Sequence, residues 1–255
     1  MNYIGIDIGS TAAKTIVFDG GKVAASFILP TGWSSKETAA RIKDRLDGSG
    51  INVGSDDTRV IATGYGRISV DYADKVLTEI TCHGKGGAAL MAEDCLIIDV
   101  GGQDTKIISV EKGTVARFLM NDKCSAGTGK FIEIMANRMG VDIEELFTLA
   151  EAGTPIPISS MCTVFAESEV ISQIGAGKSK EDIAAGIMES VVSRVALLAS
   201  RHDSSDKCIL TGGLSINPYF AKRLAKKLGQ EVFIHELGIY AGALGAALLA
   251  ADKFK

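Results

Sequence analysis

The chain is poor in the residues that build disulfide-rich or membrane-spanning proteins. It has only 4 prolines and 1 tryptophan, 6% of its residues are aromatic, and its 5 cysteines form no C-x-x-C pair. An odd number of widely spaced cysteines argues against a disulfide framework and for a reducing cytoplasm. The longest apolar stretch near the end, Ile239–Ala251, is too short to span a bilayer. The first residues enter an apolar strand pattern without the regions of a signal peptide, so we expect a cytoplasmic protein.

Neither sign of charge dominates. The net charge is −4, 23% of the 255 residues are charged and 46% are hydrophobic, as in ordinary globular proteins. No basic stripe with interleaved aromatic residues is present, so nucleic acid and membrane partners are not expected. A chain of this length buries one large core or two moderate ones.

What the chain does contain is an internal repeat. The segment Ile4–Ala24 aligns without a gap on Leu96–Ala116. The identical pairs include Asp7 and Asp99, Gly9 and Gly101, Lys14 and Lys106, and Gly21 and Gly113. Each copy is expected to form three strands joined by an Asp-x-Gly turn and a second glycine-containing turn. Such a repeat predicts two similar halves with a ligand-binding cleft between them.

The patterns outside the repeat indicate an α/β fold. Helical spacing is expected over residues 37–46, 81–91, 130–139, 141–150, 180–201, 218–228 and the C-terminal segment. Further strands are expected at 59–63, 207–211 and 232–235. We expect a first lobe of residues 1–93 plus 238–255 and a second lobe of residues 94–237.

The two Asp-x-Gly turns have the composition of phosphate-binding loops. Backbone N–H groups in such turns point at an anion, and glycine lets a phosphate come close. Asp7 and Asp99 are expected to face each other and hold a hydrated Mg²⁺. A later Thr-Gly-Gly turn, at residues 211–213, is expected to leave room for the adenosine of the nucleotide beside its backbone. The residues assigned to ATP or ADP are Gly9, Ser10, Thr11, Ala12, Ala13, Lys14, Gly101, Gly102, Gln103, Asp104, Gly212 and Gly213.

A single Asp-x-Gly turn is usually an ordinary hairpin, but two aligned copies followed by Thr-Gly-Gly favour nucleotide binding. Segments in this order resemble those of the actin-like ATPase superfamily, which includes sugar kinases, acetate kinase and heat-shock chaperones. The resemblance implies a two-lobed fold whose last helix returns to the first lobe.

Two cysteines stand apart from the other three. Cys124 and Cys162 are each expected just before a helix, where the helix dipole favours a thiolate, the form that binds metal. Two thiolates cannot complete a four-thiolate site, but a twofold dimer supplies the pair twice. The plain alternative is two partly buried core cysteines. Cys95 and Cys208 lie in apolar strand patterns and are expected in the core.

The strings IDIGST, IDVGGQDTK, NDKCSAGTGKF and SSMCTVFAESEVIS are similar to those of activators of 2-hydroxyacyl-CoA dehydratases, over essentially the whole chain. The same family includes benzoyl-CoA reductase ATPase subunits and reductases of double-cubane cluster proteins. The resemblance implies a homodimer with one [4Fe–4S] cluster held by Cys124 and Cys162 of each subunit. It also implies ATP-driven electron transfer in anaerobic metabolism, from reduced ferredoxin or flavodoxin to a dehydratase-like or double-cubane partner.

Roles within the ATP site follow by chemical analogy. Gln103 is expected to orient the attacking water, and Asp104 to assist through Mg²⁺ or water. His83 is expected to be structural. Two other functions stay open, namely a small-molecule kinase similar to type III pantothenate kinase and an actin-like switch with a dimer-bridging zinc.

Overall fold

A computed structural model of the protein describes residues 1–158, 162–202 and 207–254. Ser159, Ser160 and Met161 of the second cysteine string lie outside these residues. The chain divides into two compact units. Unit 1 comprises Met1–Ile97, Ile108–Phe118 and His235–Lys255, and unit 2 comprises Ile98–Ile107 and Leu119–Ile234. The lobe boundaries expected from the sequence stay a prediction.

The first copy of the repeat forms a mixed sheet. Its strands are β1 (Asn2–Ile8), β2 (Ala12–Asp19), β3 (Lys22–Pro30), β4 (Thr58–Thr63) and β5 (Lys75–Val76). They lie in the order β3-β2-β1-β4-β5, with β1 antiparallel to β2 and parallel to β4. Helix α1 (Ser35–Gly48) buries Ile42 and Leu46 in the same core cluster as Ile4, Ile6 and Ile8 of β1.

The second copy repeats this topology. Its strands are β6 (Leu96–Val100), β7 (Thr105–Glu111), β8 (Thr114–Asn121) and β9 (Cys208–Gly212), in the order β8-β7-β6-β9. This order matches β3-β2-β1-β4, so the repeat predicted from the alignment is present in the fold. The two-residue turn between β7 and β8 has positive φ at both Lys112 and Gly113, as type I′ hairpin turns require. Asp94 accepts hydrogen bonds from both of their N–H groups, at 2.5 and 2.9 Å.

Two small-residue helices pack in close contact within unit 1. Helix α2 (Glu79–Met91) lies against α8 (Ala241–Lys253), and both are rich in glycine and alanine. A Cβ atom at Gly245 would stand 1.8 Å from the Cys82 carbonyl oxygen, and one at Gly86 would stand 1.9 Å from that of Ala241. Only glycine permits this backbone separation, because real Cβ atoms do not approach so near.

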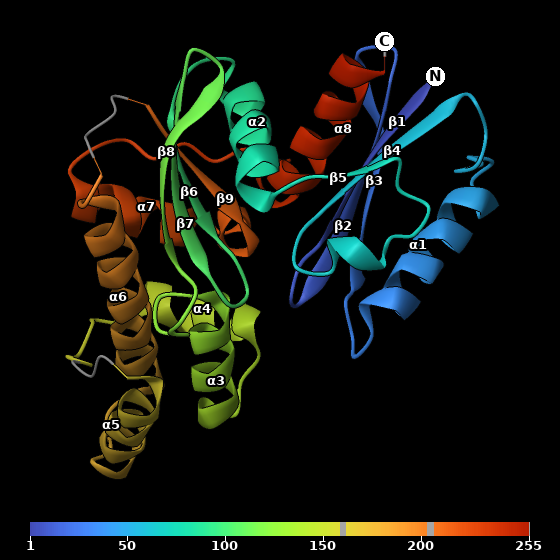
Figure 1. Ribbon diagram of the computed structural model, residues 1–255. Helices are drawn as coiled ribbons and strands as arrows, with labels where there is room; N and C mark the ends of the chain where they lie inside the picture. The colour runs from blue at the N-terminus through green and yellow to red at the C-terminus, as the bar shows by residue number, and fades with distance from the viewer. Residues whose placement is uncertain (159–161, 203–206, 255) are drawn as a thin grey trace. The chain divides into compact units, whose positions relative to one another are not determined.

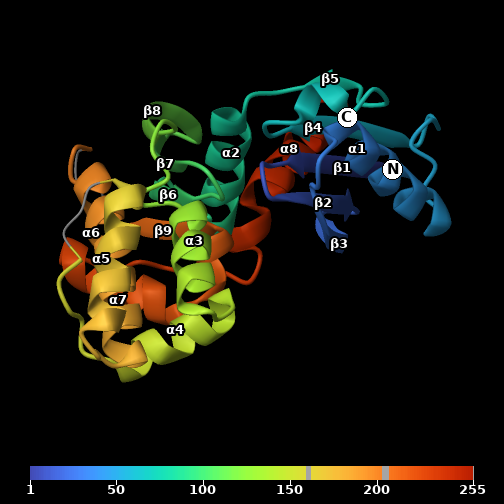
Figure 2. The ribbon, with the colours of Figure 1, turned by 90° about the horizontal axis from the view of Figure 1, so that it is seen from below.

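Unit 2 carries the remaining helices. They are α3 (Gly129–Met139), α4 (Ile143–Ala152), α5 (Thr163–Gly175), α6 (Lys180–Ala199) and α7 (Pro218–Leu228), gathered at one side of β6, β7 and β9 (Figure 2). The Asp142 carboxylate caps α4 by accepting from the Glu145 N–H at 2.7 Å. Within the described parts of the chain, no helix is long and apolar enough to cross a membrane.

One predicted strand is shorter than expected. The segment 232–235 makes only an isolated parallel bridge, between Phe233 and Ile209 of β9. Its two hydrogen bonds join the Phe233 N–H to the Cys208 carbonyl and the Leu210 N–H to the Phe233 carbonyl. The apolar residues of this segment therefore contact β9, but the segment does not continue as a paired strand beyond this one bridge.

Candidate functional site

The turn between β6 and β7 is built around a buried network of charges in unit 2. Asp99 and Lys106 are nearly inaccessible to solvent, at 1% and 3% exposure. The Lys106 ammonium lies 2.7 Å from Asp104 Oδ1 and 3.4 Å from Asp99 Oδ2. The Thr211 hydroxyl donates to Asp99 Oδ1 at 2.8 Å. Paired charges of this kind hold the carboxylates in place, since a buried charge left alone is costly.

The predicted adenosine turn packs directly against this network. Gly212 follows Thr211 with φ +83°, and a Cβ there would stand 2.4 Å from the Val100 carbonyl oxygen. A left-handed backbone in that space favours glycine. The structure therefore brings Asp99, the Gly101–Asp104 turn and Gly212 together within unit 2. Sequence reasoning missed Lys106 as a member of this site, although the repeat had aligned it with Lys14. It included Thr211 in the adenosine turn but did not predict its bond to Asp99.

The Gly101–Asp104 turn is also held from the other side, by α3. The N–H groups of Gly129 and Lys130, which open this helix, donate to the carbonyls of Gly101 and Gly102 at 2.9 and 2.7 Å. Because a trans peptide points its C=O and N–H in opposite directions, the N–H groups of Gly102 and Gln103 face away from α3. Because its carbonyls are bound by α3 and its N–H groups point away from that helix, the turn is suited to binding an anion through those N–H groups.

The matching turn in unit 1 joins β1 to β2. The Gly9 N–H donates to the Ala12 carbonyl at 3.2 Å, and the Thr31 hydroxyl donates to the Gly9 carbonyl at 2.7 Å. The Lys14 ammonium approaches Gly9, at 3.6 Å from the position a Cβ would take. Ser10 and Thr11 are exposed at the tip of the turn. These residues combine hydroxyl, amide and ammonium donors, the set expected for a phosphate.

Asp7, at the end of β1, is 5% exposed and lies among groups that the sequence did not place there. His83 of α2 approaches it, with 3.8 Å between Nε2 and Oδ2. The loop after β4 lies against the same residue, since a Cβ at Gly64 would stand 2.5 Å from Asp7 Oδ1. The Gly66 N–H in that loop donates to the Ile8 carbonyl at 2.9 Å. The string Gly64-Tyr65-Gly66 is thus a further part of the unit 1 site, and no separate signal in the sequence marked it.

The five cysteines differ sharply in environment. Cys124 and Cys162, the cysteine pair, are exposed, whereas Cys82, Cys95 and Cys208 are buried. Burial raises the pKa of the Cys82 thiol to about 12 and that of the Cys95 thiol to about 11, which keeps both protonated. Core packing, the alternative considered for Cys124 and Cys162, is therefore wrong for that pair. It describes the other three cysteines, which are buried.

The loop that carries Cys124 is joined to the start of α5 within unit 2. The hydroxyls of Ser125 and Thr163, each next to a cysteine of the pair, lie 2.8 Å apart in a hydrogen bond. Cys162 is the N-cap residue of α5, as expected. Cys124 lies further from its helix, in the loop that ends at Thr128. The first N–H groups of α3 are used by the Gly101–Asp104 turn, so the helix-dipole argument applies to Cys162 and not to Cys124.

Known proteins resemble the chain over its full length. Residues 4–250 match the model of the BadF/BadG/BcrA/BcrD ATPase family. An (R)-2-hydroxyglutaryl-CoA dehydratase activating ATPase of Acidaminococcus fermentans is 44% identical, with 98% of this chain and 97% of the relative covered. The structure of an activator of the 2-hydroxyisocaproyl-CoA dehydratase from Clostridium difficile, with bound ADPNP, is 37% identical, has a TM-score of 0.92 and covers 99% of this chain and 95% of that one.

A more distant likeness concerns the fold alone. A ROK family glucokinase from Streptomyces griseus is 16% identical, with a TM-score of 0.59 and coverage of 99% of this chain and all of that one. It supports the actin-like ATPase fold predicted from the repeated turns. The match over residues 4–250 and the close relative together confirm the resemblance inferred from the sequence strings. The chain belongs to the BadF/BadG/BcrA/BcrD ATPase family.

Proposed function

We propose that this protein uses ATP hydrolysis to drive an electron, at very low potential, from a [4Fe–4S] cluster to a partner iron–sulfur enzyme. The observation that carries the proposal is the contrast among the cysteines. Cys124 and Cys162 are exposed, and the residues that follow them, Ser125 and Thr163, are hydrogen-bonded to each other, whereas the other three cysteines are buried. The names of the relatives, an activating ATPase and a dehydratase activator, support the same activity.

The cysteine pair fits half of a cluster site. Iron–sulfur clusters bind through thiolates, and a [4Fe–4S] cluster takes four of them. Among the described residues, no group of three or more His, Cys, Asp or Glu side chains is arranged to hold a metal ion. A second copy of the chain, related by a twofold axis, supplies the other two thiolates. Cys124 and Cys162 of both copies in the homodimer would hold the cluster, which supplies the uptake and release of single electrons.

The nucleotide site is assigned to the two turns and the Gly212–Gly213 segment. ATP is held by the donors of Gly9–Lys14 and Gly101–Asp104, and Mg²⁺ by Asp7 and Asp99. In the proposed cycle the γ-phosphate is a ligand of these turns, and its release after hydrolysis removes the contacts that it makes with them.

Hydrolysis is assigned to the unit 2 turn. Gln103 is exposed there and orients the attacking water, as a glutamine does in GTPases. Asp104 assists through Mg²⁺ or water. Lys106 holds Asp104 Oδ1 at 2.7 Å and so fixes the direction of that carboxylate.

The electron acceptor is proposed to be a 2-hydroxyacyl-CoA dehydratase-like enzyme or a double-cubane protein, and the donor a reduced ferredoxin or flavodoxin. The dehydratases named for the relatives support the first acceptor class. A small-molecule kinase of this fold leaves the cysteine pair without a role. A zinc switch would use the same thiolates but transfers no electron.

The test is the metal content of the homodimer purified without oxygen. About four iron and four acid-labile sulfide per dimer are expected for one [4Fe–4S] cluster. Cys124→Ala and Cys162→Ala should each lose the iron, while Cys95→Ala, a matched change at a buried thiol, should retain it.

Each other outcome points to a different function. Zinc in place of iron, lost in the same two variants, would support the switch and overturn electron transfer. Absence of any metal, together with ATP-dependent phosphorylation of a small acceptor, would support the kinase.

A further inference from the structure

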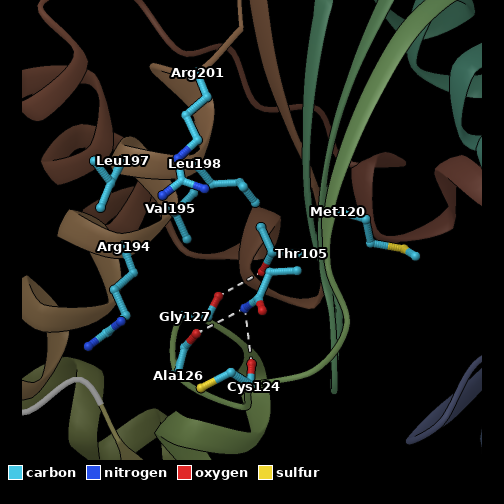
Figure 3. Close-up of a pocket in the computed structure, with 11 residues that line it drawn as sticks. Thr105, Met120, Cys124, Ala126, Gly127, Arg194, Val195, Leu197, Leu198 and Arg201 are labelled. Atoms are coloured by element: carbon cyan, nitrogen blue, oxygen red, sulfur yellow. Dashed lines mark hydrogen bonds between the residues drawn. The ribbon is translucent and has the colours of Figure 1, made fainter.

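The nucleotide turn of unit 2 and the loop that carries Cys124 are directly bonded to each other. We call residues Asn121–Thr128 the Cys124 loop. Its end runs into α3, whose first two N–H groups donate to the Gly101 and Gly102 carbonyls. A third bond joins the two segments through a side chain. The Thr105 hydroxyl, at the start of β7, donates to the Gly127 carbonyl at 2.7 Å (Figure 3).

Thr105 directly follows the nucleotide turn, Gly101–Asp104, so a movement of the turn displaces Thr105 even though it is not one of the turn residues. Successive side chains of a strand point to opposite faces. Lys106 therefore faces Asp99 and Asp104, and Thr105 faces the Cys124 loop. Thr105 is 1% exposed, so its side chain is almost fully enclosed by the protein. A displacement of the turn must move the Gly127 carbonyl or break this bond.

The Cys124 loop is stiff enough to pass such a displacement on. The Asn121 side-chain amide donates to the carbonyls of Cys124 and Ala126, at 3.0 and 3.1 Å. The Thr128 hydroxyl donates to the Ser125 carbonyl at 2.6 Å. These bonds connect the Gly127 end of the loop with Cys124.

The path continues from the Cys124 loop to the start of α5. The hydrogen bond between Ser125 and Thr163 joins the neighbour of Cys124 to the neighbour of Cys162. The Cys124 loop borders a hollow of about 240 Å³, which Thr105 and, from α6, Arg194 and Leu198 also line. The loop therefore has space next to it into which it can move while the bond from Thr105 ties it to the start of β7.

We propose that Thr105 is a positioning residue that transmits the state of the nucleotide turn to the cysteine pair. The inference rests on the proposed function and names how the two sites are linked. With ATP bound, the Gly101–Asp104 turn moves, and the bond from Thr105 moves the Gly127 end of the Cys124 loop with it. The surroundings of the cluster change as a result, before any electron leaves.

The test compares the holoprotein with ADP and with ADPNP, each with Mg²⁺. The readout is the rate at which bathophenanthroline disulfonate removes iron, together with the midpoint potential of the cluster. We expect the wild-type rates in the two nucleotides to differ by about fivefold or more, the range of a typical coupling between sites. Thr105→Val, which keeps the shape and removes the hydroxyl, should bring the two rates within about twofold of each other. Its iron content and ADPNP affinity should stay at the wild-type level.

Two further variants isolate the hydroxyl. Thr105→Ser keeps the donor and should retain the wild-type nucleotide response. Thr15→Val makes the same chemical change at a fully buried threonine whose hydroxyl has no partner among the described residues, and it should retain the response too. Asn121→Ala breaks the next link while leaving β7 intact, so it should reduce the response even if Thr105→Val folds poorly.

The outcomes separate this inference from the proposed function. A wild-type response that persists fully in Thr105→Val, or that is lost in Thr105→Ser, overturns the role of Thr105 and leaves the cluster proposal standing. Wild-type protein that binds iron but responds to no nucleotide also overturns the inference alone. Wild-type protein without iron overturns both.

Discussion

Replacing Thr211 by valine removes one buried hydrogen bond and almost nothing else. The side chain keeps its shape, but the donor to Asp99 Oδ1, at 2.8 Å, is lost. Thr211 is 0% and Asp99 1% exposed, so water does not replace the lost bond. A hydrogen bond to a charged group contributes about 1.5–3 kcal/mol, and we expect the free energy of unfolding to fall by that amount. For a chain of this size the melting temperature should fall by about 2–4 °C for each kcal/mol.

The assay is urea unfolding of the variant and the wild type, with thermal melts alongside. Thr15→Val is the control, because its buried hydroxyl has no partner among the described residues, and its unfolding free energy should change by less than about 0.5 kcal/mol. The reasoning would be refuted if Thr211→Val cost less than about 0.5 kcal/mol, or if the two variants lost equal stability.

Three further results are expected. Gly245→Ala should lower the unfolding free energy by about 3 kcal/mol or more, because its Cβ meets the Cys82 carbonyl at 1.8 Å, and a melting temperature equal to the wild type's would contradict the packing of α2 on α8. The N–H groups of Gly113 and Lys112 lower the pKa of the Asp94 carboxyl below 3.8, so Asp94→Asn should be less stable than the wild type at neutral pH. That difference should shrink as the pH falls through the lowered pKa, where protonation removes the wild-type advantage, and unfolding curves at several pH values check it. In metal-free protein at pH 8, a thiol reagent should label the cysteine pair first and Cys82 and Cys95 only on unfolding, since burial raises the pKa of both buried thiols; equal labelling rates would count against it.

The sequence predicted the fold well where local patterns decide it. The repeat predicted both sheets, because the same turn residues recur in register with the same strands. The helix limits also followed from spacing, as for α7, which is expected and observed at residues 218–228. The segment 232–235 was misjudged because an apolar run does not reveal whether a neighbouring strand continues alongside it.

The candidate site could be predicted only in part, since sequence shows which residues are present and not which of them meet. Asp99 was found through the repeat, but its bond to Thr211 joins distant strands. The cysteine pair was found through its strings, while its exposure depends on tertiary packing. The docking of α3 on the Gly101 carbonyl runs against the expectation that this helix serves Cys124.

The two copies of the repeat bind equivalent turn carbonyls, those of Gly9 and Gly101, with different hydrogen-bond donors. In the first copy a hydroxyl on a neighbouring loop, that of Thr31, holds the Gly9 carbonyl. In the second copy the backbone of a whole helix holds the equivalent Gly101 carbonyl. A shift of the first turn displaces only the neighbouring loop, whereas a shift of the second turn acts on α3, a helix of 11 residues. In the proposed coupling, the turn of the first copy therefore only binds the nucleotide, whereas the turn of the second copy also passes its movement to α3.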